Sequence, residues 1–184
     1  FRERVENDPA VSRMDSAPMV RGVITRINDR PAREVAGGHW VVEGDRGITY
    51  AGPKPDGTRV VAGEWWPEDY SGPPLVSFAR EEAEEMGIGL GDTLTVNILG
   101  RDLTVTIASL REVDFSNAGM GFVMTLNPAA VAGAPHSFIA TVYAEEHAEA
   151  AILRDLANTY PNLPALRVRA AIARASAVLA GLAA

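Results

Sequence analysis

The sequence contains no cysteine, which excludes disulfide bonds, thiol catalysis and the zinc or iron–sulfur sites that need cysteine ligands. It is also short of positive charge, with 17 Lys and Arg residues against 24 Asp and Glu and a formal net charge of −7 at pH 7. Nucleic acid requires a basic footprint and anionic lipid requires polybasic clusters, so both are poor partners for this chain. No run of about 20 apolar residues is present that could span a bilayer.

Apolar residues make up 47% of the 184 residues, which is enough for a hydrophobic core and argues against intrinsic disorder. The length suits one mid-sized domain or two small lobes. The chain begins with Phe1 rather than Met and shows no signal peptide, so we expect a processed chain or an excised domain. From Arg167 onward the sequence is first basic and then uncharged, which fits either the approach to a membrane helix or an Ala-rich helix packed on the domain.

The clearest local pattern is an amphipathic β-hairpin. Residues 93–99 and 103–110 alternate apolar and polar side chains, and residues 100–102 join them. The sequence NDRP at 28–31 indicates a turn. Further strands are expected over residues 18–28, 39–42, 48–50, 59–62 and 122–126.

Helices are expected at both ends and in the middle of the chain. Residues 1–8 are charged and typical of a short helix, and Ser77 suits the N-cap of a helix that ends at Gly87. Residues 145–160 place apolar side chains four apart, as an amphipathic helix does.

The last third of the chain predicts a βαβ unit. The helix over 145–160 is preceded by a continuous apolar strand over 137–143, of the kind that is buried on both faces, and followed by a strand over 163–168. We therefore expect an α/β lobe from residues 1–72 and 134–184, with residues 73–133 inserted as a β-rich lobe.

Three histidines are the main candidates for chemistry, and none forms a recognisable site. His39, His136 and His147 lack a second ligand at metal-binding spacing. No nucleophile elbow is present, and neighbours in a strand such as His136 and Ser137 face opposite ways. The glycine-rich stretch at 87–93 lacks the lysine of a phosphate loop. No catalytic residue, cofactor or metal is predicted.

Aromatic side chains are the candidates for partner contact. Trp65 and Trp66 stand beside Tyr70, and one of the adjacent tryptophans should face the core while the other does not. The pair forms either a contact surface or a loop anchor. Phe115 and Met120 are further candidates for an exposed contact patch.

Four stretches together resemble a known family. They are APMVRGVITRIND (17–29), TRVVAGEWW (58–66), EEMGIGLGDTLTVNILGRDLTVTIASLREVDF (84–115) and FVMTLNPAAVAGAPHSFIATVY (122–143). In order and spacing they are similar to the large extracytoplasmic domain of FtsX-like, MacB-type ABC transporter permeases, and within these to the YbbP-type subgroup. The likeness covers roughly residues 10–170. The loop DFSNAGMGF (114–122) departs from the family pattern.

The resemblance implies a two-lobed α+β fold, in which a porter-like α/β lobe with a βαβ unit carries an inserted, mostly-β, small-barrel-like lobe. It implies a location between two membrane helices, on the periplasmic side of the bacterial inner membrane. Gly63, Gly91, Asp92 and Gly100 match motif positions, and the resemblance implies that they serve turns.

The function implied is non-enzymatic and needs no cofactor. The domain would transmit conformational change driven by ATP hydrolysis in a separate cytoplasmic ATPase subunit. It would also contact cargo, a second permease copy or a periplasmic adaptor, in export or in lipid or lipoprotein transport. Two alternatives stay open: a periplasmic hydrolase that uses His136 or His39 in a cleft between the lobes, and a small-barrel ligand- or peptide-binding module with a pocket or an exposed edge strand.

Overall fold

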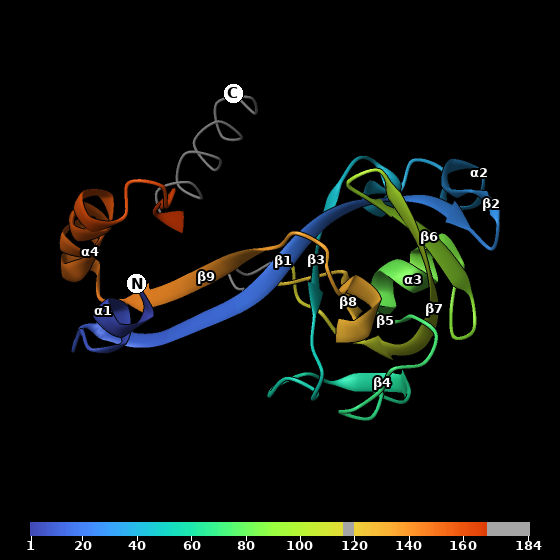
Figure 1. Cartoon of the computed structure of the whole chain (residues 1–184), viewed down its shortest axis with the longest axis horizontal. Helices are drawn as coiled ribbons and strands as arrows, with labels where there is room; N and C mark the ends of the chain where they lie inside the picture. The colour runs from blue at the N-terminus through green and yellow to red at the C-terminus, as the bar shows by residue number, and fades with distance from the viewer. Residues whose placement is uncertain (116–119, 169–184) are drawn as a thin grey trace, which may run out of the picture. The chain divides into compact units, whose positions relative to one another are not determined.

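The computed structural model describes residues 1–115 and 120–168, which form two compact units (Figure 1). Unit 1 combines residues 1–15 with the chain from residue 140 onward, and unit 2 comprises residues 16–139. The units therefore change at 15/16 and 139/140, whereas the sequence pattern placed lobe boundaries at 72/73 and 133/134. Whether the lobe boundaries at 72/73 and 133/134 mark independently folding domains stays a prediction.

The fold is mixed α+β, as the sequence predicted, and its main element is a nine-stranded sheet with parallel and antiparallel pairs. β3 with β8 and β5 with β7 are parallel, and the hairpin β6–β7 is antiparallel. The strands are β1 (Val11–Ile27), β2 (Arg30–Pro31), β3 (Arg46–Tyr50), β4 (Val60–Gly63), β5 (Leu75–Ala79), β6 (Thr93–Ile98), β7 (Arg101–Arg111), β8 (Met124–Leu126) and β9 (Ser137–Ala144).

A ring of strands organises unit 2. The hydrogen-bonded path runs from β1 through β3, β8, β5 and β7, and β6 pairs with both β7 and β1, which returns the path to its start. The short strand β2 continues from β1, β4 pairs with β7, and β9 pairs with β1.

The helical elements of the described residues are short except for α4. They are α1 (Arg2–Glu6), α2 (Ala32–Ala36), the 3-10 turn η1 (Trp40–Val42), α3 (Arg80–Met86), the 3-10 turn η2 (Pro128–Val131) and α4 (Glu146–Thr159). α3 ends at Gly87 in the left-handed conformation, which confirms the predicted C-terminal glycine.

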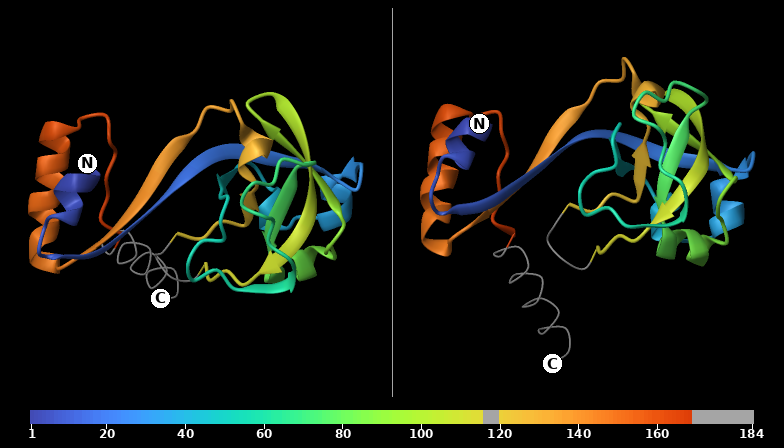
Figure 2. Two further views of the ribbon diagram at one scale, coloured as in Figure 1. Left: turned by 60° about the horizontal axis from the view of Figure 1, so that its bottom comes forward. Right: turned by 90° about the horizontal axis from the view of Figure 1, so that it is seen from below.

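The β6–β7 hairpin supplies much of the core of unit 2, and Figure 2 shows it from two further sides. Its alternation buries Leu94 and Val96 of β6 together with Val105 and Ile107 of β7, as predicted, and Leu94 lies directly opposite Val105. Phe78 of β5 is among the largest side chains that are fully buried with them.

Gly91 and Gly100 lie in turns, as the resemblance implied, and Asp92 directly follows Gly91, whereas Gly63 is the last residue of strand β4. The backbone of Gly91 has φ +84°, a conformation that strains other residues. Asp92 accepts hydrogen bonds from the amide of Gly89 (2.8 Å) and the side chain of Asn28 (3.0 Å). At Gly63 an added Cβ would lie 2.2 Å from the carbonyl oxygen of Ala108, so no larger residue fits there.

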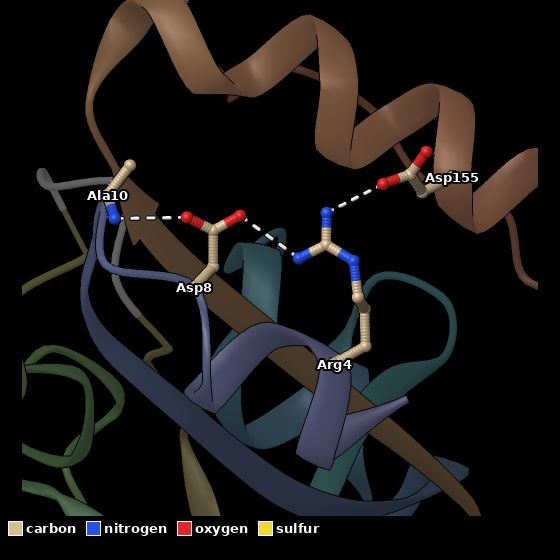
Figure 3. A network of polar contacts seen from close by, with 4 residues as sticks. All are labelled: Arg4, Asp8, Ala10 and Asp155. Carbon is tan, nitrogen blue, oxygen red and sulfur yellow. Dashed lines mark hydrogen bonds and ion pairs between the residues drawn. The ribbon is translucent and has the colours of Figure 1, made fainter.

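Unit 1 is built from α1, α4 and the adjoining ends of β1 and β9. α4 buries Ala148, Ile152 and Leu156, which confirms the predicted four-residue spacing. Arg4 links three segments of the unit (Figure 3): its guanidinium donates to Asp155 on α4 (2.6 Å) and to Asp8 (3.0 Å). Asp8 in turn accepts from the amide of Ala10 (3.0 Å).

Two local predictions near the middle of the chain are wrong. Residues 40–42 form the 3-10 turn η1 and not part of a strand. Ser77 lies inside β5, where its hydroxyl meets that of Ser109 on β7 (2.8 Å), and α3 begins only at Arg80. The segment is extended because β7 and β8 hydrogen-bond its two edges, and that tertiary pairing outweighs the capping preference of serine.

The βαβ prediction is also wrong for the described residues, because 163–167 contains no strand. β9 is not buried on both faces either: Phe138 is 71% exposed and Ile139 is 38% exposed. In the part of the chain described, β9 pairs with β1 alone, so its apolar run lacks the neighbouring strand and covering layer that such a run usually has.

Among residues 1–115 and 120–168, no helix is both long enough and apolar enough to cross a membrane. The basic and then uncharged sequence after Arg167 falls largely in 169–184, outside the described residues.

Candidate partner-contact surface

Trp65 and Trp66 hold a loop in place. The indole N–H of Trp65 donates to the carbonyl of Gly52 and that of Trp66 to the carbonyl of Ala51, each at 2.9 Å. The two ring centroids lie 4.3 Å apart. Trp66 is buried and Trp65 is half-buried, which confirms that only one of the pair faces the core fully. This geometry supports the loop-anchor interpretation, and contact of Trp65 with a partner stays a prediction.

Tyr70 belongs to the same loop. Its hydroxyl donates to the carbonyl of Pro73 (2.6 Å), and Gly72 lies against its ring so closely that an added Cβ would be 2.7 Å from the hydroxyl oxygen. The ring is half-buried and closes the loop on itself. Its role in partner contact is likewise a prediction.

Phe115 lies elsewhere in unit 2, against Trp40. The two ring centroids are 5.4 Å apart with an interplanar angle of 80°, an edge-to-face contact. Trp40 is 41% exposed and Phe115 is 38% exposed. We call this pair the aromatic surface. Met120 is half-buried, and residues 116–119 between it and Phe115 are outside the described residues.

Two neighbours hold Trp40 in position. The guanidinium carbon of Arg46 lies 5.4 Å from the centroid of the Trp40 ring, a cation–π distance, and Arg46 also donates to the carbonyl of Glu43 (2.5 Å). On the sequence-adjacent side, the imidazole of His39 stacks on the Trp40 ring, with centroids 5.9 Å apart and an interplanar angle of 30°. Arg46 and His39 therefore support Trp40, and the guanidinium of Arg46 adds a positive charge beside the aromatic surface.

His39 connects this surface to α3. Its Nε2 lies 2.5 Å from a carboxylate oxygen of Glu85, and its Nδ1 accepts the backbone N–H of Val41 (3.2 Å). The hydrogen bond to Val41 is also the N-terminal cap of η1, the turn that carries Trp40.

Two buried charges lie near this connection, on α3 and β7. Burial raises the pKa of Glu82, and its Oε2 has no hydrogen-bond partner among the described residues. Burial also lowers the pKa of Arg111 to about 10, while its guanidinium donates to the carbonyl of Phe122 (2.5 Å) and the hydroxyl of Thr125 (2.9 Å). The negative charge of Glu82 raises the pKa of Arg111 and so opposes part of the lowering that burial causes.

The other two histidines lie away from the aromatic surface in the sequence and make different contacts. His136 packs edge-on between Tyr50 and Phe138, at 5.6 and 5.5 Å between ring centroids. His147 lies beside Glu145 on unit 1 (3.2 Å). None of the hydrogen bonds found for the histidines in residues 1–115 and 120–168 reaches a serine or threonine hydroxyl, so none forms a nucleophile–base pair.

A shallow groove of about 490 Å³ lies beside Tyr50 and His136 on unit 2. It is lined mainly by the small residues of 131–135, with Pro128 at one side. Within the described ranges, no group of three or more His, Asp or Glu side chains is placed to hold a metal ion.

Sequence reasoning identified Phe115 and missed Trp40, because residues 39–42 were assigned to a strand. The signal available was the pair Gly37 and Gly38 immediately before His39 and Trp40. Gly37 has φ +60° and ends α2, so the chain turns sharply there and presents the next residues at the surface.

Comparison with known proteins connects the chain to a transporter. No protein-family model matches it. Over 122 residues, 66% of this chain, it is 28% identical to the uncharacterized ABC transporter permease YbbP of Escherichia coli (strain K12). The matched part spans only 14% of the length of that permease. The chain is therefore a distant relative of one part of an ABC transporter permease.

Proposed function

We propose that this chain is a non-catalytic, extracytoplasmic domain of an ABC transporter permease subunit, on the periplasmic side of the inner membrane. The observation that carries the proposal is the 28% identity to YbbP over 122 residues. The family resemblance of the four motif stretches, with their turn-forming glycines, supports the same subgroup. In this proposal ATP is hydrolysed by a separate cytoplasmic ATPase subunit.

The domain would work by transmitting conformational change. β1 contains residues of both units, since it runs from Val11 to Ile27, and β9 does so as well. Movement of the membrane helices would bias the two units between alternative arrangements, as ligands do in other two-state proteins. Two paired strands shared by both units are a suitable element for this coupling.

The aromatic surface of Trp40 and Phe115 would contact a partner outside the membrane: cargo, a second permease copy or a periplasmic adaptor. Aromatic and arginine side chains dominate the energetics of protein interfaces. Trp40, Phe115 and Arg46 combine these side chains at one place, and the two rings are each about two-fifths exposed.

The location is testable because the chain has no cysteine. Single cysteines placed at Val61 and Leu99, which are both exposed, in the complete parent permease should react with a membrane-impermeant maleimide in spheroplasts before lysis. The parent without an added cysteine is the control. Labelling that requires lysis at both positions would contradict the proposed location.

The contact surface is tested with a photoreactive amino acid. Placed at Trp40 or Phe115 in the full-length permease, it should crosslink to a transport component or to a second copy. The same group at Leu99, which is 71% exposed on the hairpin turn, is the matched control. Equal crosslinking at all three positions would contradict a specific surface.

One observation favours a second candidate function, a ligand- or peptide-binding module: the groove beside Tyr50 and His136. Native mass spectrometry of the chain purified from its host would detect a retained ligand. Loss of that ligand in Tyr50→Ala, with retention in Trp40→Ala, would favour this alternative.

A further inference from the structure

His39 makes two hydrogen bonds of opposite kind. Nδ1 accepts from the amide of Val41, so this nitrogen carries no proton, and Nε2 faces the carboxylate of Glu85 and must be the N–H donor. The neutral imidazole with its proton on Nε2 satisfies both partners. No other protonation state of the ring does so.

The bond to Val41 holds the turn that carries Trp40. Val41 is fully buried, so its amide cannot turn to water if its acceptor is lost. The other bonds of the turn run from Val42 to the carbonyl of His39 and from Glu43 to the carbonyl of Trp40. His39 therefore contributes one carbonyl and one ring nitrogen to this single turn.

A second proton on the imidazole would break this arrangement. It would sit on Nδ1 and point at the N–H of Val41, so two donors would face each other and the cap would open. The contact with Glu85 would become an ion pair and strengthen. Imidazole is the side chain whose ordinary titration lies between pH 5 and 8.

The charged groups around His39 come from several elements. α3 supplies Glu85 and the buried Glu82, both negative toward the ring. Beside the turn itself, Arg33 on α2 pairs with Glu43 at the end of η1, and the guanidinium of Arg46 on β3 lies over the Trp40 ring.

We propose that His39 is a proton-operated latch on the aromatic surface. Neutral His39 accepts the Val41 amide, caps the turn and holds Trp40 in the position for partner contact. Protonated His39 loses the bond to Val41 and pairs more strongly with Glu85, so the turn is released. The latch would make partner contact depend on the pH outside the membrane, and this consequence rests on the proposed function.

The test is amide and indole NMR of the 184-residue chain between pH 8 and pH 5. On acidification the hydrogen-exchange protection factor of Val41 should fall roughly fivefold, the factor that one ordinary hydrogen bond is worth. The Trp40 indole signal should shift over the same pH range. His39→Gln should abolish both changes, and the matched control His136→Gln should retain them.

Glu85→Gln provides a second variant that keeps the imidazole. It removes the carboxylate that receives the charge, so the same transition should occur at lower pH. The proposal is overturned if the Val41 and Trp40 signals stay constant from pH 8 to pH 5, or if they change equally in His39→Gln. Because these signals come from the isolated chain, failure here leaves the labelling test of the permease location standing, and the reverse also holds.

Discussion

Units 1 and 2 are stabilised by different means. The core of unit 2 is a continuous apolar cluster contributed by most strands of the ring, with Phe78, Leu94 and Met124 fully buried. In unit 1, the cluster on α4 consists of three buried side chains, and Arg4 adds ion pairs to Asp8 and Asp155. Exposed ion pairs contribute little to the free energy of unfolding, whereas the contribution of buried apolar surface grows with the area buried. Unit 2 should therefore be the more stable of the two units.

This difference in stability bears on the proposed transmission of conformational change. Segments with few buried apolar contacts open at lower free energy than the core of the same protein. Unit 1 would then open first under force or under changed solution conditions. The ring of strands in unit 2 would meanwhile keep Trp40 and Phe115 of the aromatic surface in position.

The largest expected effect is on the core of unit 2. Phe78→Ala should lower the free energy of unfolding by about 3–5 kcal/mol, because it removes a fully buried ring from the central strand β5. Urea unfolding followed by tryptophan fluorescence measures the loss. The control is Val61→Ala, at a site that is 38% exposed. Similar losses for both variants would show that unit 2 does not depend on this core.

The next effect separates the units. Ile152→Ala should cost about 2 kcal/mol, the lower end for such a change, because the surrounding cluster is small. Hydrogen exchange should accelerate at amides of α4 and remain unchanged in the β6–β7 hairpin. Equal acceleration in both would mean that the two units unfold as one, and would remove the comparison.

A polar contact of unit 2 gives the third effect. Asp92→Ala should cost about 1–2 kcal/mol, because the hydrogen bonds from the Gly89 amide and the Asn28 side chain lose their acceptors. Asp92→Asn keeps one carbonyl oxygen and should lose less. Thermal unfolding of the two variants side by side is the measurement, and an equal loss would argue against the hydrogen bonds as the cause.

The buried carboxyl group of Glu82 in unit 2 should make the free energy of unfolding depend on pH in the direction opposite to that of most carboxyl groups. Because burial raises the pKa of Glu82, its stabilising proton is fully bound below the unfolded pKa and is lost as the pH rises through the folded pKa. Glu82→Gln should therefore favour the folded state more at pH 7 than at pH 4, because only at the higher pH does it remove a buried negative charge. Urea titrations at the two pH values test this, with Glu68→Gln, at an exposed position outside α3, as control. A gain at pH 4 as large as that at pH 7 would contradict it.

The smallest effect has the opposite sign and lies in unit 1. The hydrogen bond from the Ala10 amide, and then Arg4, lower the pKa of Asp8. The resulting stabilisation is present above the unfolded pKa and is lost as the pH falls through the folded pKa. Asp8→Asn should weaken α4 slightly at pH 7 and not at acid pH, as seen by hydrogen exchange. The exposed Glu6→Gln should have no such effect, and a matching response would refute the assignment to Asp8.

Sequence patterns predicted the elements whose signals are local. The hairpin over 93–110 follows strict alternation, and α4 follows four-residue spacing, so both were correct. Ser77 failed because β7 and β8 pair with its segment, which no local pattern reveals. The predicted strand over 137–143 was expected to be buried on both faces, but an apolar run does not indicate whether another layer covers it.

The candidate surface was only half visible in the sequence. Phe115 stood out as an aromatic beside polar residues, but its contact with Trp40 joins positions 75 residues apart in the chain. Helix α3 likewise brings Glu85 to His39, across 46 residues. Such contacts depend on tertiary packing, and the spacing of the residues along the chain does not predict them. The transporter relationship came from the resemblance and not from the site chemistry.

The ring has a mechanical consequence for β1. Within unit 2, this strand is hydrogen-bonded on one edge to β3 at residues 20–22 and on the other to β6 at residues 23–27. A pull that enters the chain near residue 15 and acts along the strand loads these ladders in shear. Sheared ladders yield only when many hydrogen bonds break together, whereas a free edge strand peels one bond at a time. β1 can therefore transmit tension into unit 2 as a stiff connection and not as a hinge.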